Sequence, residues 1–202
     1  MITKIYPSSL YNYLRYIQFN TTNKRILDCG AGGPDPKLAF FYENGFESYG
    51  IDISEDQIQK AEDFCKKNNV KLKIVKGDMR DIPFKSKYFG NVYSYLSMVH
   101  LSKNDTFQAI NEIHRVLMKG GLCYLNFLSK DDRWYDESME IIPGEIVSKD
   151  GNKEYLHSYY DDDEPDHFFN NFEILYKEKR RILKGNYFDT RRTCILDYIV
   201  KK

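Results

Sequence analysis

The sequence has no long hydrophobic run, few cysteines and no excess of charge of either sign. No apolar stretch in the 202 residues approaches the ~20 that a membrane-spanning helix needs, and the N-terminus lacks the charged and then apolar pattern of a secretory signal. The cysteines include no CxxC pair, so we expect reduced thiols and neither disulfides nor a metal site. These four are Cys29, Cys65, Cys123 and Cys194. The absences together predict a cytoplasmic protein without a membrane partner.

The charge balance bears on the class of partner. Lysine plus arginine and aspartate plus glutamate both number 30, which gives a net charge of zero. Nucleic-acid-binding proteins usually carry a basic excess, so we expect no nucleic-acid partner. The length is enough for one α/β domain with a full core, and we expect a single domain over residues 1–202.

The stretch from Arg25 to Pro36, RILDCGAGGPDP, is predicted to join a short strand to a glycine turn and a helix. Ile26 and Leu27 provide the apolar run of a strand that is buried on both faces. The glycines allow positive φ angles and close approach of a ligand to the backbone. Asp35 and Pro36 are expected to open the helix as N-cap and first helical residue. This order of elements favours a nucleotide-type cofactor site.

Two acidic side chains in this stretch argue against a cofactor that carries phosphate. The dinucleotide fingerprint G-x-G-x-x-G, counted from Gly30, has Asp35 where its third glycine should stand. Asp28, at the strand end, also repels phosphate and attracts an amine or another cation. S-adenosylmethionine carries a sulfonium and an amino group and has no phosphate. An NAD-dependent oxidoreductase is therefore a disfavoured alternative.

The pattern D-x-G-x-G-x-G, which begins at Asp28 and has Pro34 in place of its last glycine, resembles motif I of class I S-adenosylmethionine-dependent methyltransferases. Asp52 follows Asp28 by 24 positions, where an α/β cofactor fold places an acid that accepts both ribose hydroxyls. The string GDMRDIPF from Gly77 is similar to motif III of the same family. That resemblance implies that Asp78 accepts from the adenine amino group and that the next backbone N–H meets a ring nitrogen.

The segment RVLMKGG, residues 115–121, looks like the R-V-L-K-P-G-G signature before the fifth strand of this family, without its proline. Its glycines are expected to end the preceding helix, which should begin near Ser102 and carry Phe107 inward. The resemblance covers roughly residues 24–129 and is closest to the small-molecule, ubiquinone-biosynthesis-like group. It implies a Rossmann-like, seven-stranded α/β sheet with helices on both faces and an antiparallel last strand.

The segments outside this core have less standard roles. Residues 1–22 should form an amphipathic helix capped by Ser8 or Ser9, which either packs its apolar stripe on the core or forms a lid over the cofactor. Residues 130–171 are expected to form a substrate-side insertion with a hairpin that turns at Asp150-Gly151. Its acidic run from Asp161 to Glu164 fits a helix start better than a metal site.

Residues 172–202 are predicted to form the closing antiparallel strands, on either side of Gly185-Asn186. Their basic residues suggest either the solvated face of an edge strand, which we favour, or a patch for an anion. These residues are Lys177, Lys179, Arg180, Arg181, Arg191 and Arg192.

The chain is thus expected to be a methyltransferase that transfers a methyl group from S-adenosylmethionine to a small molecule by in-line displacement. The alternative is a non-catalytic module that binds S-adenosylmethionine or S-adenosylhomocysteine. Candidate proton acceptors are His100, Tyr95 and His157. No metal ligand is predicted. The predicted cofactor-binding residues are Asp28, Gly30, Ala31, Gly32, Asp52, Ile53, Asp78, Met79 and Tyr95.

Overall fold

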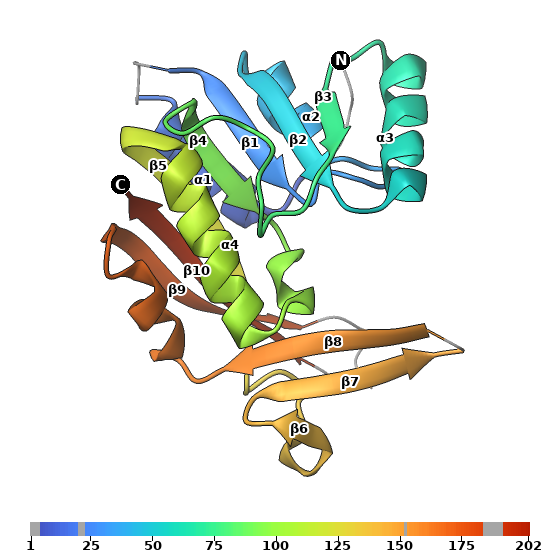
Figure 1. The fold of residues 1–202 in the computed structure, drawn as a ribbon, viewed down its shortest axis with the longest axis vertical. Coiled ribbons are helices and arrows are strands. Elements are labelled where there is room, and N and C mark those ends of the chain that lie inside the picture. Colours follow the sequence, from blue (N-terminus) through green and yellow to red (C-terminus); the bar gives the residue numbers. More distant parts are fainter. Residues whose placement is uncertain (1–4, 20–22, 152, 184–191) are drawn as a thin grey trace.

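A twisted sheet with helices on both faces organises the chain in the computed structural model, which describes residues 5–19, 23–151, 153–183 and 192–202 (Figure 1). The α-helices are α1 (Ser8–Ile17), α2 (Leu38–Glu43), α3 (Glu55–Asn68) and α4 (Lys103–Val116). The short 3-10 helices are η1 (Met98–His100), η2 (Glu137–Met139) and η3 (Glu164–Phe169). The strands are β1 (Arg25–Cys29), β2 (Glu47–Asp52), β3 (Lys73–Lys76), β4 (Phe89–Ser94), β5 (Leu117–Ser129), β6 (Glu140–Ile142), β7 (Glu145–Asp150), β8 (Lys153–Tyr160), β9 (Glu173–Leu183) and β10 (Arg192–Lys201).

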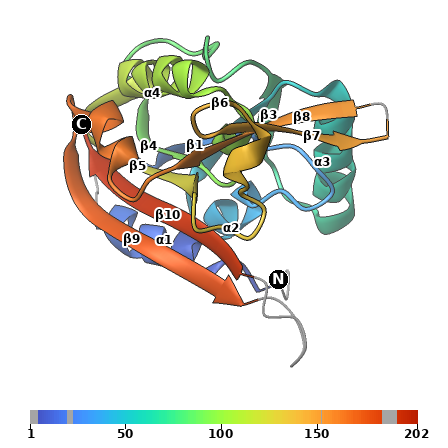
Figure 2. The ribbon, with the colours of Figure 1, turned by 90° about the horizontal axis from the view of Figure 1, so that it is seen from below.

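The main sheet has the strand order β3-β2-β1-β4-β5-β10-β9. Strands β1 to β5 are parallel, β10 is antiparallel to β5, and β9 is antiparallel to β10. Figure 2 shows α4 on one face and α1 with α2 on the other. Each face has its own apolar core, one containing Ile110 and Ile113 of α4, the other Leu10 and Tyr13 of α1. The predicted Rossmann-like sheet with an antiparallel last strand is confirmed.

The N-terminal helix packs against the sheet. The fully buried Tyr13 hydroxyl donates to the carbonyl oxygens of Val92 and Leu122, at 2.9 and 2.8 Å. None of the residues of α1, which the structure describes in full, lines the cavity discussed below. The core-packing alternative therefore accounts for this helix, and the lid has no support here. The predicted serine cap is wrong, because α1 starts directly after Pro7 without a side-chain cap.

Two predicted helix boundaries also differ from the structure. Helix α2 starts at Leu38, and Asp35 does not cap it, because its carboxylate accepts a hydrogen bond from Lys37 Nζ at 2.9 Å. Helix α4 already ends at Val116, so the glycine pair lies inside β5. Gly120 there has a φ of +76°, beside the irregularity in the β4–β5 pairing. The glycines therefore accommodate an irregular strand pairing and do not end the helix.

Two serines cap their helices as the sequence pattern indicates. Ser54 accepts a hydrogen bond from the backbone N–H of Gln57 at 3.4 Å, and Ser102 accepts one from Asp105 at 3.0 Å. The inward position predicted for Phe107 is wrong. Its side chain is 48% exposed and its ring lies beside that of Phe168 in η3, because it lies off the helix face that meets the sheet.

The predicted hairpin is present in the insertion after β5. Strands β7 and β8 pair antiparallel around the turn at Gly151, and β8 continues parallel to the end of β5 through Leu128 and Ser129. Since β5 ends at the carboxyl edge of the parallel strands, the hairpin lies at that same edge (Figure 1). Helix η3 begins directly after Asp163, so the acidic run does start a helix, of 3-10 type.

The acidic run is neutralised by lysines. Each carboxylate of the run has its own lysine partner. The pairs are Asp161–Lys130, Asp162–Lys179, Asp163–Lys177 and Glu164–Lys103. On β9, Arg181 pairs with Asp131, and Arg180 pairs with the buried Asp197. The described basic residues of the closing strands thus face carboxylates and form neither a free anion patch nor a simple solvated face. Arg191, the side chain of Arg192 and Gly185-Asn186 lie outside the described part of the chain.

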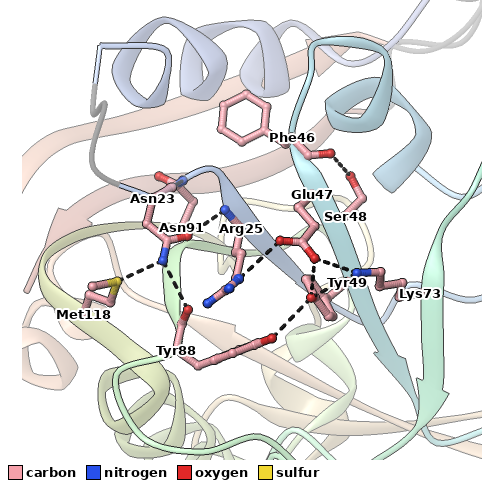
Figure 3. Close-up of polar contacts among 10 residues, drawn as sticks. All are labelled: Asn23, Arg25, Phe46, Glu47, Ser48, Tyr49, Lys73, Tyr88, Asn91 and Met118. Carbon is pink, nitrogen blue, oxygen red and sulfur yellow. Dashed lines mark hydrogen bonds and ion pairs between the residues drawn. The ribbon is translucent and has the colours of Figure 1, made fainter.

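The amino edge of the parallel strands carries a network of paired charges (Figure 3). Glu47 accepts from Arg25 Nε at 3.2 Å and from Lys73 Nζ at 2.5 Å. The Tyr49 hydroxyl donates to the same carboxylate at 2.6 Å and lies 3.2 Å from the Tyr88 hydroxyl. The hydrogen bond from Lys73 contributes most to lowering the pKa of Glu47 to about 2. Exposed pairs of this kind stabilise a fold by only ~0–1 kcal/mol each, so the network mainly ties strand ends together.

Candidate cofactor site

A cavity of about 630 Å³ lies at the carboxyl edge of the parallel strands. In open α/β sheets, this edge is where ligands bind, and the volume is within the range of small-molecule sites. Its walls come from the segments that follow β1, β2, β3 and β4, from the start of α4 and from β8. The lining residues are Gly30, Ile51, Asp52, Ile53, Gln57, Gly77, Asp78, Met79, Arg80, Leu96, Ser97, His100, Leu101, Ser102, Asp105 and Leu156.

Asp52, the last residue of β2, has a fixed carboxylate. Its Oδ2 accepts from the backbone N–H of Gly32 at 2.8 Å, and its Oδ1 accepts from that of Ser54 at 2.9 Å. Ser54 in turn caps α3. Each carboxylate oxygen keeps a free lone pair, because an ionised carboxylate has about four acceptor positions. Two adjacent hydroxyl groups of a ligand therefore match this side chain.

The glycine turn after β1 is tied to β2 and leaves no room for a side chain at Gly30 or Gly32. The backbone N–H groups of Gly30 and Ala31 both donate to the carbonyl oxygen of Ile51 at 2.9 Å. Gly30 has a φ of +107°, and a Cβ there would lie 2.1 Å from Ser97 Oγ. A Cβ on Gly32 would lie 2.5 Å from Asp52 Oδ2. The sequence therefore needs glycine at both positions, and the turn brings its bare backbone against the cavity wall.

Asp78 and Arg80, which follow β3, form a bidentate ion pair in the cavity. Arg80 Nε lies 3.0 Å from Asp78 Oδ1, and Nη2 lies 2.6 Å from Oδ2. The hydrogen bond from Arg80 is the main cause of the lowered pKa of Asp78. Arg80 Nη1 also lies 3.3 Å from the carboxylate of Asp105 on α4. Arg80 thus connects two walls of the cavity, a contact that the motif alone did not indicate.

Asp28 lies beneath the turn, outside the cavity lining. It is 3% exposed and accepts a hydrogen bond from the Tyr93 hydroxyl at 2.6 Å. Burial raises the pKa of Asp28 from 3.8 to about 7, the Tyr93 hydrogen bond opposes that rise, and the charge of Asp52 adds to it. The chain therefore holds a carboxyl group close to half-ionised at neutral pH below the turn.

We expect Asp28→Asn to stabilise the protein above pH 7 and to do so less at pH 5. Because the folded pKa is raised, the carboxyl stabilises the fold below pH 3.8, and this contribution is lost as the pH rises to about 7. An asparagine still accepts from Tyr93 and has no charge to bury. Thermal unfolding of both proteins at pH 5 and pH 8 measures the difference. An equal shift in melting temperature at the two pH values would mean that the Asp28 pKa is normal.

Of the three candidate proton acceptors, His100 is the one that lines the cavity. Its Nδ1 lies 3.2 Å from the carbonyl oxygen of Leu156. A carbonyl only accepts, so Nδ1 carries the proton and Nε2 of the neutral ring has a free lone pair. His157 lies behind it, with ring centroids 5.0 Å apart, and bonds to Ser148 Oγ. Burial is the main cause that lowers the pKa of His157, and the like charge that the His100 ring carries when it is protonated adds to it.

The structure brings together most of the predicted cofactor residues. Five of the nine predicted cofactor residues line the cavity, together with the candidate proton acceptor His100: Gly30, Asp52, Ile53, Asp78 and Met79. Gly32 is not part of the lining, but its backbone N–H donates to the lining residue Asp52. The remaining predicted residues also lie outside the described lining: Asp28, Ala31, Tyr95 and His157. Burial raises the pKa of Tyr95, so its deprotonated form, the one that could accept a proton, is less populated than in an exposed tyrosine. Within the described ranges, no group of three or more His, Cys, Asp or Glu residues could hold a metal ion.

Several lining residues were missed by the sequence reasoning. Arg80 stands within the GDMRDIPF motif, Gln57 lies in the first turn of α3, and Leu96 with Ser97 follow the carboxyl end of β4. Leu156 comes from the hairpin, 60 positions after Leu96. No local sequence pattern predicts a contact between residues so far apart in the chain. No helix of the described residues is both long enough and apolar enough to cross a membrane.

Comparisons with known proteins agree with this geometry. Residues 27–125 match the model of a family described as a methyltransferase domain. The sterol 24-C-methyltransferase of Pneumocystis carinii is 33% identical over 127 residues, which are 59% of this chain and 32% of that protein. That of Kluyveromyces lactis is 35% identical over 115 residues, 54% of this chain and 30% of that protein. The chain spans about a third of the length of these curated relatives.

Solved structures extend the likeness of the fold to nearly the whole chain. A SAM-dependent methyltransferase from Methanosarcina mazei has a TM-score of 0.79 at 19% identity, over 98% of each chain. A S-adenosylmethionine-dependent methyltransferase from Clostridium acetobutylicum has a TM-score of 0.70 at 17% identity, over 96% of this chain and 89% of the other. With its motifs in order and residues 27–125 matched to this family, the chain contains a methyltransferase domain and has the fold of S-adenosylmethionine-dependent methyltransferases.

Proposed function

We propose that this chain binds S-adenosylmethionine in the cavity and transfers the methyl group to a small-molecule acceptor. The observation that carries the proposal is the Asp52 carboxylate, fixed by the N–H groups of Gly32 and Ser54 with an acceptor position left on each oxygen. These positions suit the two ribose hydroxyls. The backbone of Met79 is available to the adenine ring, whereas the carboxylate of Asp78 has to give up part of its ion pair before it can accept from the adenine amino group. The glycine turn lines the cavity through backbone atoms alone.

The bound cofactor supplies an activated methyl group on its sulfonium, so the protein needs to provide mainly orientation. Holding two reactants in line lowers a barrier by up to ~7–11 kcal/mol. Leu96 and His100 line the cavity from the segment after β4, and Leu156 lines it from β8. We propose that they hold the acceptor in line with the carbon–sulfur bond and exclude water from it.

His100 is the residue that we propose as proton acceptor, because it lines the cavity and has a free Nε2 lone pair. General base catalysis contributes about 10²–10⁴-fold. We therefore expect His100→Gln to lower kcat by that factor and to leave the dissociation constant of the cofactor unchanged. His167→Gln is the matched control, since His167 lies on η3 and outside the described cavity lining. Equal kcat values for the wild type and His100→Gln would exclude this role.

An apolar acceptor fits the cavity best. Leu96, Leu101 and Leu156 line the same cavity as His100, and the curated relatives are named sterol 24-C-methyltransferases. The balanced charge of the chain also supports a small molecule over a nucleic acid. We propose, in addition, a cytoplasmic location, supported by four free thiols, of which Cys29, Cys123 and Cys194 are buried.

Calorimetric titration of the whole chain with S-adenosylmethionine, S-adenosylhomocysteine and NAD tests the cofactor. Binding of the first two without NAD is the expected result, and binding of NAD alone would overturn the proposal. Turnover is then measured by mass spectrometry with a panel of apolar and polar acceptors. Tight S-adenosylhomocysteine binding without turnover of any acceptor would favour the non-catalytic binding module.

A further inference from the structure

Leu96, in the segment after β4, has a backbone conformation that leucine rarely adopts. Its φ is +54°. This lies in the left-handed region, which residues other than Gly, Asn and Asp seldom adopt. Leu96 lines the cavity, and its neighbour Ser97 is the residue that approaches Gly30. Such a conformation persists only where the surrounding structure holds it.

A buried side chain holds this backbone. The Leu96 N–H donates to Asn126 Oδ1 at 2.8 Å, and Asn126, on β5, is 1% exposed. The Nδ2 of Asn126 donates to the Tyr124 hydroxyl at 3.3 Å, so both ends of its amide are engaged. The Tyr124 hydroxyl donates to Asp197 Oδ1 at 2.6 Å.

The chain of hydrogen bonds ends in a charge on β9. Arg180 Nε donates to Asp197 Oδ2 at 2.8 Å, and Asp197 is 1% exposed. Asp197 lies opposite Asn126 in the β10–β5 register. The strands β5, β10 and β9 thus present one buried polar row beneath α1, where Arg180 Nη2 also lies 3.5 Å from Ser9 Oγ. Burying such a row is costly unless all its members are satisfied.

We propose that Arg180, Asp197, Tyr124 and Asn126 form a positioning relay that fixes the Leu96–Ser97 wall of the cofactor cavity. Asn126 accepts the hydrogen bond from the Leu96 N–H. The Arg180–Asp197 ion pair orients Asn126 through the Tyr124 hydroxyl. The relay connects the closing strands, which lie outside the family-matched residues 27–125, to the site. Its effect on the cofactor rests on the proposed function, whereas its effect on the Leu96 backbone does not.

The test uses Asn126→Ala in the full chain, with two readouts. We expect the dissociation constant of S-adenosylhomocysteine to rise by about tenfold or more. We also expect the protection of the Leu96 amide, measured by NMR hydrogen exchange, to fall by a similar factor. Asn91→Ala is the matched control, because Asn91 is equally buried at the amino end of β4 and bonds to Asn23. It should lower stability without changing either readout.

A second variant, Leu96→Gly, separates an effect on the Leu96 backbone from a general loss of stability in Asn126→Ala. Glycine adopts positive φ without strain, so in a Leu96→Gly background the Asn126→Ala change should raise the dissociation constant by clearly less than in the wild type. An equal factor in both backgrounds, or unchanged Leu96 protection in Asn126→Ala, would overturn the relay. If the wild type binds no S-adenosylhomocysteine, the proposed function fails, and the amide protection alone still decides the relay.

Discussion

Gly30→Ala should abolish measurable cofactor binding and lower methyl transfer by at least about 10²-fold, the loss expected when a reacting group is displaced by about 1 Å. Two effects combine at this position. The φ of +107° strains any residue with a Cβ, and the new Cβ would lie 2.1 Å from Ser97 Oγ and 2.4 Å from Ser97 Cβ. Rotation of the serine side chain does not remove the second contact, so the backbone at Ser97 or at the turn has to move.

Gly45→Ala separates these two effects. Gly45, between α2 and β2, has a φ of +80°, and no heavy atom lies within 4 Å of the Cβ it would gain. The variant should therefore lose roughly 1–2 kcal/mol of stability from the left-handed backbone alone and bind the cofactor like the wild type. Calorimetry gives the affinities, and circular dichroism confirms that both variants are folded. Wild-type affinity in Gly30→Ala would show that the turn does not contact the ligand.

Asp52→Ala should weaken binding of S-adenosylmethionine and S-adenosylhomocysteine by about 10-fold to 150-fold. A hydrogen bond to a charged acceptor is worth ~1.5–3 kcal/mol, and each 1.4 kcal/mol is about a factor of ten in affinity. The variant also leaves the N–H groups of Gly32 and Ser54 without their acceptor, which loosens the turn. Asp52→Asn keeps one acceptor oxygen and should fall between the wild type and Asp52→Ala.

Asp56→Ala is the control for charge near this helix end. Asp56 lies in the first turn of α3, pairs with Lys60 and is absent from the described cavity lining. Its loss should leave cofactor affinity unchanged, because an exposed pair contributes little. If Asp52→Ala also binds with wild-type affinity, then the ribose hydroxyls are not held by this carboxylate, and the main support for the proposed function is lost.

The local motifs predicted the part of the site that two adjacent segments build. The strand–glycine–helix pattern located Gly30, and the position of Asp52 at the end of the next strand was sufficient to expect them at one edge. Parallel strands force their carboxyl ends together, so neighbouring motifs in sequence become neighbours in space. The same reasoning did not indicate that Asp28 is buried outside the cavity lining, because sequence does not tell whether a strand-end carboxyl points into the cavity or beneath the turn.

By itself, the sequence determined the class of sheet, the glycine turn and the acids at Asp52 and Asp78, since these depend on periodicity, φ preference and spacing within a few residues. Only the tertiary structure decided which side chains complete the walls. Leu156 reaches the cavity through a hairpin, and Asn126 reaches Leu96 across 30 positions. Such contacts depend on the pairing of strands β5, β8 and β10, and a pairing register is set by the whole sheet rather than by any one segment.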